Sequence, residues 1–251
     1  MNAPAAPPEI HLDQVSKTFT RPGGGEAFRA VDDLTLSIAP GELVALLGKT
    51  GCGKSTIFNM IAGLGAPSAG RVLVQGHDPF REFDWFRGKI AIVFQSDRLL
   101  PWRTAIGNVE LGLDILDVPR EARREQAQSW LERLGLAGHE HDYPHALSGG
   151  MRQRVAIARA FATNAAILLC DEPFSALDEH TAQRLRDEFV GLVRQNRKTA
   201  VFITHSISEA LQVGDRIVVL RRPARIAYDV RVSGADGHGA IRQRIQEILA
   251  E

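Results

Sequence analysis

The sequence contains little cysteine and has no excess of charge of either sign. Only two of its 251 residues are cysteine, Cys52 and Cys170, which excludes a disulfide framework and suits a reducing compartment. The 30 Lys and Arg residues equal the 30 Asp and Glu residues in number. Proteins that bind nucleic acid usually carry a basic excess, so we expect no nucleic-acid partner.

Long apolar runs are also missing. No stretch approaches the roughly 18 apolar residues that a membrane-spanning helix needs. Residues 1–8 are rich in Ala and Pro and have neither the basic nor the apolar segment of a signal peptide, so we expect a flexible tail there. Action at a membrane would therefore require a partner protein.

Short and nearly continuous apolar runs are present. Because helical stretches separate them, they predict a parallel sheet covered on both faces. These runs are residues 43–47, 90–94, 166–170, 200–203 and 217–220. Apolar and polar residues instead alternate over 34–38, and a further strand is expected at 71–74, before the turn Gln75-Gly76. These two segments predict a small antiparallel layer beside the parallel core.

The middle of the sequence is helical in character. Residues 119–136 carry many charges but keep apolar side chains on one face, which predicts an amphipathic helix, and a second helix is expected at about 150–162. Residues 97–160 therefore predict a helical subdomain inserted between two core strands. We expect one domain over residues 9–230 and a short C-terminal extension over 231–251. The glycine run 23–25 predicts a flexible surface turn.

The strongest motif is Gly-Lys-Thr-Gly-Cys-Gly-Lys-Ser at residues 48–55, directly after the apolar run 43–47. It matches the phosphate-loop pattern G-x-x-x-x-G-K-[ST], and a chance match in this length is on the order of one in several hundred. The glycines let backbone N–H groups surround a phosphate, and the helix expected from about Lys54 directs its positive end at the same anion. Lys54 supplies a cation for the β- and γ-phosphates, and the Ser55 hydroxyl is a ligand for Mg²⁺. This motif predicts Mg-ATP binding.

Two carboxylates follow the apolar residues 167–170. A strand that ends in Asp171-Glu172 presents both at the carboxyl edge of the sheet, where such folds bind ligands. Asp171 is expected to accept Mg²⁺ or its waters, and Glu172 is expected to act as the general base for the attacking water. A solvated pair of strand-end acids is the alternative, but the phosphate loop in the same chain favours catalysis.

A third motif is Leu147-Ser148-Gly149-Gly150. A Ser-Gly-Gly turn that opens a helix offers exposed N–H groups, a hydroxyl and a helix N-terminus to an anion. The alternative is an ordinary capped helix start, and the residues alone do not decide between the two.

With these three motifs in this order and at these separations, the chain resembles the nucleotide-binding subunit of ATP-binding cassette (ABC) transporters from Glu9 to about Arg225. The resemblance implies an α/β fold, with a P-loop NTPase core of mainly parallel sheet, an antiparallel β layer and an inserted helical subdomain. It implies that Phe19 stacks on adenine, that Gln95 touches Mg²⁺ and the attacking water, and that His205 contacts the γ-phosphate. Residues 175–178, ending at Asp178, would cross a dimer interface.

The expected site residues follow from the motifs and the resemblance together. The catalytic residues are Glu172, His205, Gln95 and Lys54, and the Mg²⁺ ligands are Ser55, Gln95 and Asp171. The nucleotide contacts are Phe19, Gly48, Lys49, Thr50, Gly51, Cys52, Gly53, Lys54, Ser55, Thr56, Ser148, Gly149, Gly150 and Asp178. Taken singly, Phe19 also reads as a core residue, Gln95 and His205 as strand-end polar residues, and Asp178 as a helix cap.

The family further implies a head-to-tail homodimer. Each nucleotide lies between the phosphate loop of one chain and the residue 148–150 turn of the other. Closure then depends on the γ-phosphate, and hydrolysis reopens the dimer.

Residues 96–104 suggest a membrane partner. In transporters this region faces a coupling helix of the membrane subunit, and an apolar, aromatic patch suits a helix-in-groove contact. The run Leu99-Leu100-Pro101-Trp102, with residues 151–154 and 222–226, resembles an importer branch that takes up nitrate, taurine and alkanesulfonates. This implies a permease and a solute-binding protein as partners, at the cytoplasmic face of the inner (plasma) membrane. The alternative is that Leu99, Leu100 and Trp102 pack within the helical insertion.

The chain departs from the family pattern at two places. Lys49-Thr50 replaces a more usual Pro-Ser pair, and Ser206 follows His205 where an acid is frequent. A DNA-repair or chromosome-organising ATPase would carry long coiled coils, and no sustained heptads occur. A translation-factor type would carry two cassettes, whereas one phosphate loop is present. An ABC ATPase of a lipid-trafficking complex remains the alternative to an importer.

Overall fold

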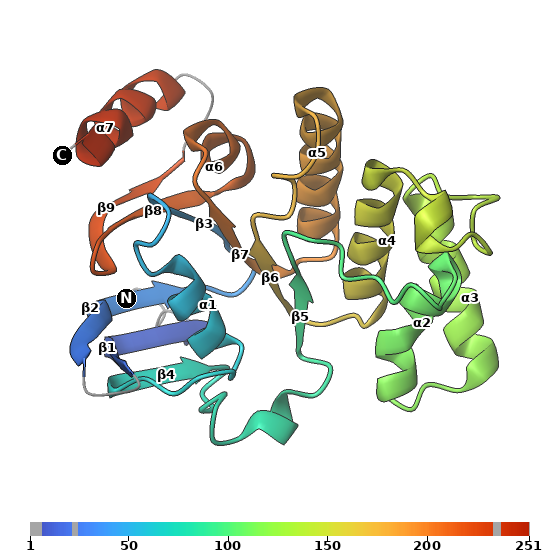
Figure 1. Cartoon of the computed structure of the whole chain (residues 1–251), viewed down its shortest axis with the longest axis horizontal. Helices are drawn as coiled ribbons and strands as arrows, with labels where there is room; N and C mark the ends of the chain where they lie inside the picture. The colour runs from blue at the N-terminus through green and yellow to red at the C-terminus, as the bar shows by residue number, and fades with distance from the viewer. Residues whose placement is uncertain (1–6, 22–24, 233–236, 251) are drawn as a thin grey trace, which may run out of the picture. The chain divides into compact units, whose positions relative to one another are not determined.

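The computed structural model describes residues 7–21, 25–232 and 237–250. They form two compact units (Figure 1). The first contains the described residues up to Phe86 and those from Lys198 onward, and the second contains Arg87–Arg197. Residues 1–6 of the predicted tail and residues 23 and 24 of the predicted glycine turn lie outside the described residues.

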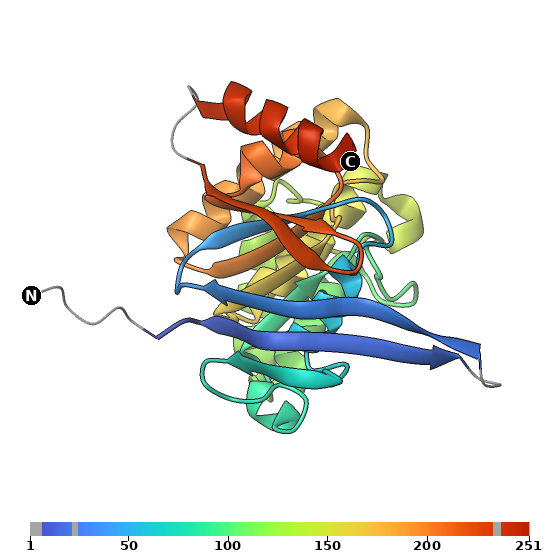
Figure 2. The ribbon, with the colours of Figure 1, turned by 90° about the vertical axis from the view of Figure 1, so that its left-hand side faces the viewer.

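The first unit contains the antiparallel layer that the alternating pattern predicts. Its strands are β1 (Ile10–Arg21), β2 (Gly25–Ile38) and β4 (Ala69–Val74), in the order β2-β1-β4, with both pairs antiparallel. Figure 2 shows β1 and β2 as long neighbouring strands. Leu34, Leu36 and Ile38 are buried while Thr35 and Ser37 are exposed. The prediction is confirmed, although β2 is much longer than its alternating part.

The parallel strands of this unit are β7 (Thr199–Thr204), β3 (Leu43–Leu47) and β8 (Arg216–Arg221), with β3 between the other two. Every residue of β3 and β7 is buried, as expected for strands that are covered on both faces. β9 (Arg225–Arg231) pairs antiparallel with β8. β9 was not predicted from the sequence, because it contains no continuous apolar run. Exposed and half-buried residues alternate along it.

Helices α1 (Lys54–Ile61), α6 (Ile207–Val213) and α7 (His238–Ala250) and the short 3₁₀ helix η1 (Phe83–Phe86) complete the unit. The C-terminal extension, for which the sequence suggested no role, therefore contains α7. Ile241, Ile245 and Ile248 form an apolar stripe at helical spacing. They join a buried cluster with residues of β3, β8 and α6, including Ala45, Leu47, Ala210 and Ile217. The helix thus covers part of the sheet.

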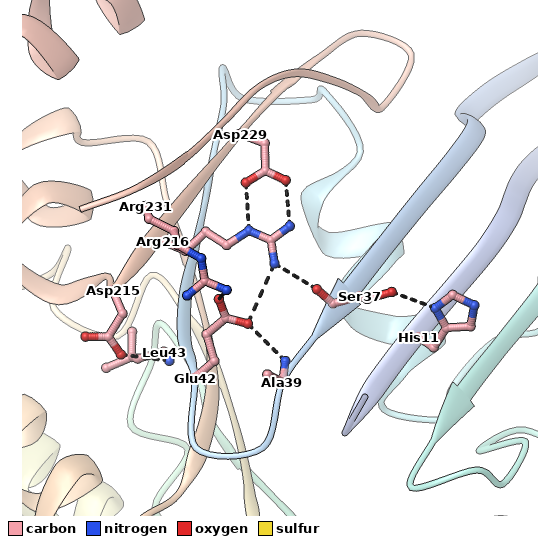
Figure 3. Close-up of polar contacts among 9 residues, drawn as sticks. All are labelled: His11, Ser37, Ala39, Glu42, Leu43, Asp215, Arg216, Asp229 and Arg231. Atoms are coloured by element: carbon pink, nitrogen blue, oxygen red, sulfur yellow. Dashed lines mark hydrogen bonds and ion pairs between the residues drawn. The ribbon is translucent and has the colours of Figure 1, made fainter. Parts of the chain in front are cut away.

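A polar cluster lies at the amino ends of β3 and β8 and the carboxyl ends of β2 and β9 (Figure 3). The buried Glu42, just before β3, accepts a hydrogen bond from the Ala39 backbone N–H at 2.9 Å. Arg216 of β8 donates two hydrogen bonds to the Asp229 carboxylate of β9, at 2.7 and 2.6 Å, and one to the Ser37 carbonyl of β2 at 2.8 Å. The bonds to Asp229 raise the pKa of Arg216. Such two-pronged charged bonds fix geometry well, so the cluster holds β2, β8 and β9 in register.

The second unit contains the parallel strands β5 (Ile90–Val93) and β6 (Ile167–Asp171). Helices α2 (Ala105–Ile115), α3 (Arg120–Arg133) and α4 (Gly149–Ala162) pack against one another, and η2 (Pro144–Ala146) and α5 (Glu179–Gln195) complete it. α3 and α4 confirm the two predicted helices. The strand predicted over residues 90–94 ends one residue early, at Val93. None of the helices in the described residues has both the length and the apolar character to cross a bilayer.

We predict that α7 is part of the folding unit. Ile245 is fully buried, so Ile245→Ala should lower the free energy of unfolding by about 2–5 kcal/mol, the usual loss for removing a buried Ile side chain. Urea unfolding followed by circular dichroism measures this. The exposed Gln246 of the same helix provides the control Gln246→Ala, which should be nearly neutral. Equal stabilities for the two variants would show that α7 contributes little to the fold.

Candidate functional site

The phosphate loop follows β3 and leads into α1. Gly51 and Gly53 have φ angles of 78° and 109°, which L side chains rarely adopt. A Cβ atom at Gly53 would lie 2.5 Å from the Ala30 carbonyl oxygen and 2.7 Å from Ala224 Cβ. One at Gly48 would lie 2.8 Å from the Leu220 carbonyl oxygen. The backbone therefore passes where only glycine fits, and glycine-rich loops of this kind can direct their N–H groups at a phosphate.

Lys54 is held inside this loop. Its side chain is buried, and Nζ donates hydrogen bonds to the carbonyl oxygens of Gly48 at 2.6 Å and Lys49 at 3.2 Å. Gly53 precedes the helix without a side-chain cap, so the first N–H groups of α1 are open to an anion. The loop, the helix start and the ammonium group together suit a phosphate chain.

His205 lies next to the phosphate loop. Leu47 of β3 pairs with Thr204 of β7 in a parallel register, so both segments leave the sheet at the same edge. The Thr204 hydroxyl donates to Glu209 at 2.5 Å and accepts from the Ser206 N–H at 2.9 Å, and Ser206 Oγ accepts from the Glu209 N–H at 3.3 Å. His205 is thus exposed within a tightly bonded helix start.

This arrangement explains Ser206. The residue is the N-cap of α6, and Ser206-Ile207-Ser208-Glu209 has the spacing of a capping box. The sequence analysis treated Ser206 only as a departure from the family pattern. The S-x-x-E spacing was present in the sequence and could have identified Ser206 and Glu209 as the start of the helix that directly follows His205.

Phe19 lies on β1 opposite Phe28 of β2. Its side chain is 47% exposed, so it is not a core residue, and Lys17 Nζ lies 5.2 Å from the ring centroid. Its predicted role beside adenine stays a prediction.

The second unit brings Gln95 close to the carboxylate strand. Val93 pairs with Cys170 in parallel register, so Gln95 and Glu172 follow neighbouring strands at one edge. Gln95 Nε2 donates to Ser175 Oγ at 3.1 Å, and that hydroxyl donates to the Glu172 carbonyl at 3.0 Å. Glu172 has a φ of 44°. A non-glycine residue in this left-handed region is strained, and such strain is concentrated at functional sites.

The Ser-Gly-Gly turn starts α4. Ser148 Oγ accepts from the Met151 N–H at 3.3 Å, which confirms the capped helix start without excluding an anion site. A Cβ atom at Gly149 would lie 3.7 Å from Leu177, whereas one at Gly150 would lie 3.0 Å from Thr181. The turn therefore adjoins the predicted dimer-crossing segment 175–178.

Asp178 is the N-cap of α5, and its predicted contact with a nucleotide stays a prediction. Its carboxylate accepts from the Thr181 N–H at the start of α5, at 3.0 Å. This bond lowers the pKa of Asp178.

The loop after Gln95 is fixed to α4. Arg152 Nε donates to the Asp97 carboxylate at 3.0 Å, and Arg159 donates to the carbonyl oxygens of Asp97 at 2.7 Å and Arg98 at 2.9 Å. Burial lowers the pKa of Arg159. From the sequence, Arg152 stood out only within residues 151–154 for their resemblance to the importer branch, and Arg159 did not stand out, because nothing in a charged helix indicates which arginine reaches a distant loop.

Asn108 fixes the next part of the same loop. Its side chain is fully buried. It accepts from the Leu100 N–H and donates to the carbonyl oxygens of Leu100, Arg103 and Thr104, all at 2.7–3.2 Å. Leu99 is buried, as the packing alternative expected, but Trp102 is 71% exposed. The loop therefore presents an indole on a rigid support.

The predicted site residues are divided between the units. The first unit contains Phe19, residues 48–56 and His205, and the second contains Gln95, Asp171, Glu172, residues 148–150 and Asp178. Their assembly around one nucleotide stays a prediction.

We predict that Gly53→Ala will abolish nucleotide binding, because the added methyl group collides with Ala30 and Ala224 and the φ of 109° is lost. Gly65→Ala is the matched control, since nothing lies within 4 Å of a Cβ there. Titration with a fluorescent ADP analogue compares the two, with circular dichroism to check folding. Normal ADP affinity in a folded Gly53→Ala variant would contradict the importance of this contact.

Comparison with known proteins identifies the family. A sequence model described as "ABC transporter" matches residues 31–175. The chain is 42% identical over 213 residues to the nitrate import ATP-binding protein NrtC of Synechococcus elongatus and 44% identical over 191 residues to the taurine import ATP-binding protein TauB of Yersinia pestis. It is 42% identical over 219 residues to the Fe(3+) ions import ATP-binding protein FbpC of Agrobacterium fabrum. These matches cover 84%, 76% and 86% of this chain, and 32%, 73% and 59% of the respective relatives.

A solved structure has the same fold. It is a dimeric ATP-binding cassette in a post-hydrolysis state bound to ADP and Pi, 35% identical to this chain, with a TM-score of 0.78. The match covers 90% of this chain and 99% of that chain. This agrees with the α/β architecture and with the phosphate loop described above. The chain belongs to the ABC transporter family and is an ATP-binding cassette ATPase.

Proposed function

We propose that this ATPase powers an importer for a small solute such as nitrate, a sulfonate or taurine, through a permease and a solute-binding protein. The observation that carries the proposal is the exposed Trp102 on a loop that Asn108, Arg152 and Arg159 hold rigid. The import functions named for the NrtC, TauB and FbpC relatives support it. In this proposal the chain acts at the cytoplasmic face of the membrane.

The proposed reaction is hydrolysis of the β–γ phosphate bond by water. Lys54 binds the β- and γ-phosphate oxygens, and Glu172 polarises the attacking water as general base. Gln95 orients that water, His205 holds the γ-phosphate, and Phe19 stacks on the adenine.

The chemistry of the proposed ligands suits a magnesium ion. Mg²⁺ is usually held by one or two protein oxygens together with the phosphates, and Ser55, Gln95 and Asp171 have the required oxygen donors. When bound, the ion neutralises charge that develops on the phosphates.

The proposed active form is a head-to-tail homodimer with shared sites. The exposed Ser148 and Gly149 begin α4, where N–H groups and a hydroxyl suit the γ-phosphate of a partner's nucleotide. The dimeric state of the ADP-bound cassette supports the proposal. In such a dimer ATP contributes to the interface, so its hydrolysis weakens the interface.

Mixing two inactive variants tests the shared site. Lys54→Ala removes the phosphate cation, and Gly149→Asp places a carboxylate at the helix start. Gly149 suits this test because its Cβ position is only in ordinary contact with its neighbours. In a mixed dimer one site carries both changes and the other carries neither. We expect the mixture to recover about one quarter of the wild-type ATPase rate, since half of randomly paired dimers are mixed and each has one whole site of two.

If both motifs served the nucleotide of their own chain, every site in the mixture would keep one change. A mixture as inactive as its parents, with mixed dimers confirmed by mass spectrometry, would therefore contradict the shared site. Gly191→Asp is the control for the added carboxylate, because Gly191 of α5 has open space around its Cβ position. It should retain wild-type activity.

Trp102→Ala tests the importer proposal. Because the side chain is 71% exposed, the isolated subunit should keep its unfolding midpoint and basal ATPase rate. Its co-purification with the permease should fall at least about tenfold, as expected for the loss of an aromatic anchor. Ile115→Ala is the matched control, since Ile115 is 56% exposed at the opposite end of α2.

Undiminished assembly and transport by Trp102→Ala would remove the support for this docking surface. A fall in stability or basal activity would instead assign Trp102 a structural role. The cargo is identified separately, by screening ligands of the co-purified solute-binding protein.

A further inference from the structure

A basic pocket lies in the first unit between the turn that joins β8 to β9 and the helix α7. It has a volume of about 410 Å³ and is lined by Arg221, Arg222, Pro223, Arg225, Ile226, Ala227, Arg244 and Ile248. Four of these residues are arginines, and no acidic residue is among the described residues that line it. Guanidinium groups that converge on one concavity are suited to an oxyanion.

The arginines are held in place by separate contacts. Arg221 donates from Nε and from a terminal nitrogen to the Ile248 carbonyl, at 3.1 and 2.6 Å, which fixes the end of α7 to β8. The Arg222 guanidinium lies 5.0 Å from the ring centroid of Phe28. These contacts orient both guanidinium groups.

Two of the arginines that line the pocket form ion pairs with carboxylates. Arg225 pairs with Asp32, but the same carboxylate also accepts from Arg29 at 2.7 Å. Arg244 pairs with Glu247 at 3.0 Å in a solvent-exposed contact, and such pairs are weak. In the contacts described here, four arginines line the pocket and two carboxylates pair with them, and this excess of positive charge favours an incoming anion.

The pocket adjoins the phosphate loop. A neighbouring cavity of about 370 Å³ shares Arg221, Arg222 and Ile248 with it and is also lined by Lys49 and Thr50. Both Lys49 and Thr50 depart from the family pattern. Lys49 thus adds a further cation beside the arginines.

We propose that this pocket, here named the arginine pocket, binds a small organic anion with a sulfonate, carboxylate or phosphate head. The arginines bind the head, and Pro223, Ile226 and Ala227 contact a short apolar body. The volume suits a small molecule, since ligand pockets usually measure some 300–1,000 Å³.

The site is expected to be coupled to nucleotide binding. The Ala224 N–H donates to the Ala30 carbonyl at 2.9 Å, and Ala224 Cβ borders Gly53. Leu220 and Ala224, which lie on either side of Arg222 in the sequence, thus border Gly48 and Gly53 of the phosphate loop. An anion bound between the β8–β9 turn and α7 would move the turn and, with it, the backbone that holds the phosphate loop. Because such coupling is reciprocal, the nucleotide and the anion would change each other's binding affinity by the same factor.

The test measures ethanesulfonate binding by calorimetry on the full chain, with sodium chloride at equal ionic strength as the reference. Arg222→Ala and Arg244→Ala should each weaken binding about tenfold or more, as the loss of a charged hydrogen bond predicts. Arg242→Ala is the matched control on α7, since Arg242 is exposed and does not line the pocket. Arg222→Lys should retain part of the affinity for ethanesulfonate, because lysine keeps the positive charge but lacks the planar set of N–H donors of the guanidinium group.

Titration in the presence of ADP separates this site from the nucleotide site. For a separate, coupled site, the apparent dissociation constant of ethanesulfonate should reach a plateau as ADP saturates. A constant that rises in proportion to ADP would mean that both ligands occupy the phosphate loop, and it would overturn the proposal. Equal affinities in wild type, Arg222→Ala and Arg244→Ala would overturn it as well.

Discussion

The contact between the phosphate loop and the backbone beneath it sets the geometry of the first unit. At Gly53 the loop approaches the Ala30 carbonyl on one side and Ala224 on the other, so closely that no side chain fits. β2 and the β8–β9 turn therefore carry the loop, and the loop in turn starts α1. The turn is itself bonded to Ala30 and Asp32. The shape of the anion site thus depends on segments that are distant in sequence and are joined by backbone hydrogen bonds and by the ion pair between Arg225 and Asp32.

The parts of the fold with a dense local signal were predictable. β3 and β7 are buried along their whole length and appear as apolar runs, and α3 and α4 have helical periodicity. β9 and α7 were not predicted. β9 lies at the edge of its sheet, where alternate half-burial leaves a weak pattern, and α7 places only three isoleucines against the core. Such elements are stabilised by tertiary contacts that are not encoded locally.

The site residues also divide into those that could be predicted from the sequence and those that could not. Glycines, Lys54 and the carboxylates at 171 and 172 follow from spacing, because the chemistry of phosphate binding fixes their order along the chain. The hydrogen bonds next to His205 and around Gln95 do not follow from spacing. Thr204 reaches Glu209 and Ser206 through its hydroxyl, and Ser175 links Gln95 to the backbone of Glu172. Each of these bonds depends on a side-chain direction that only the folded chain defines. The strained φ of Glu172 is likewise invisible in the sequence.

The attachment of the Trp102 loop to α4 has a mechanical consequence. Arg152 and Arg159 are seven residues apart, about 10 Å along the helix axis, yet both hold the segment at Asp97 and Arg98. Because the two arginines leave α4 two turns apart and hold the same loop segment, that segment resists both tilting and sliding along the helix. A force on the indole therefore cannot bend the loop alone. The force is transmitted to α4 as a whole, and Ser148 is the N-cap of that helix.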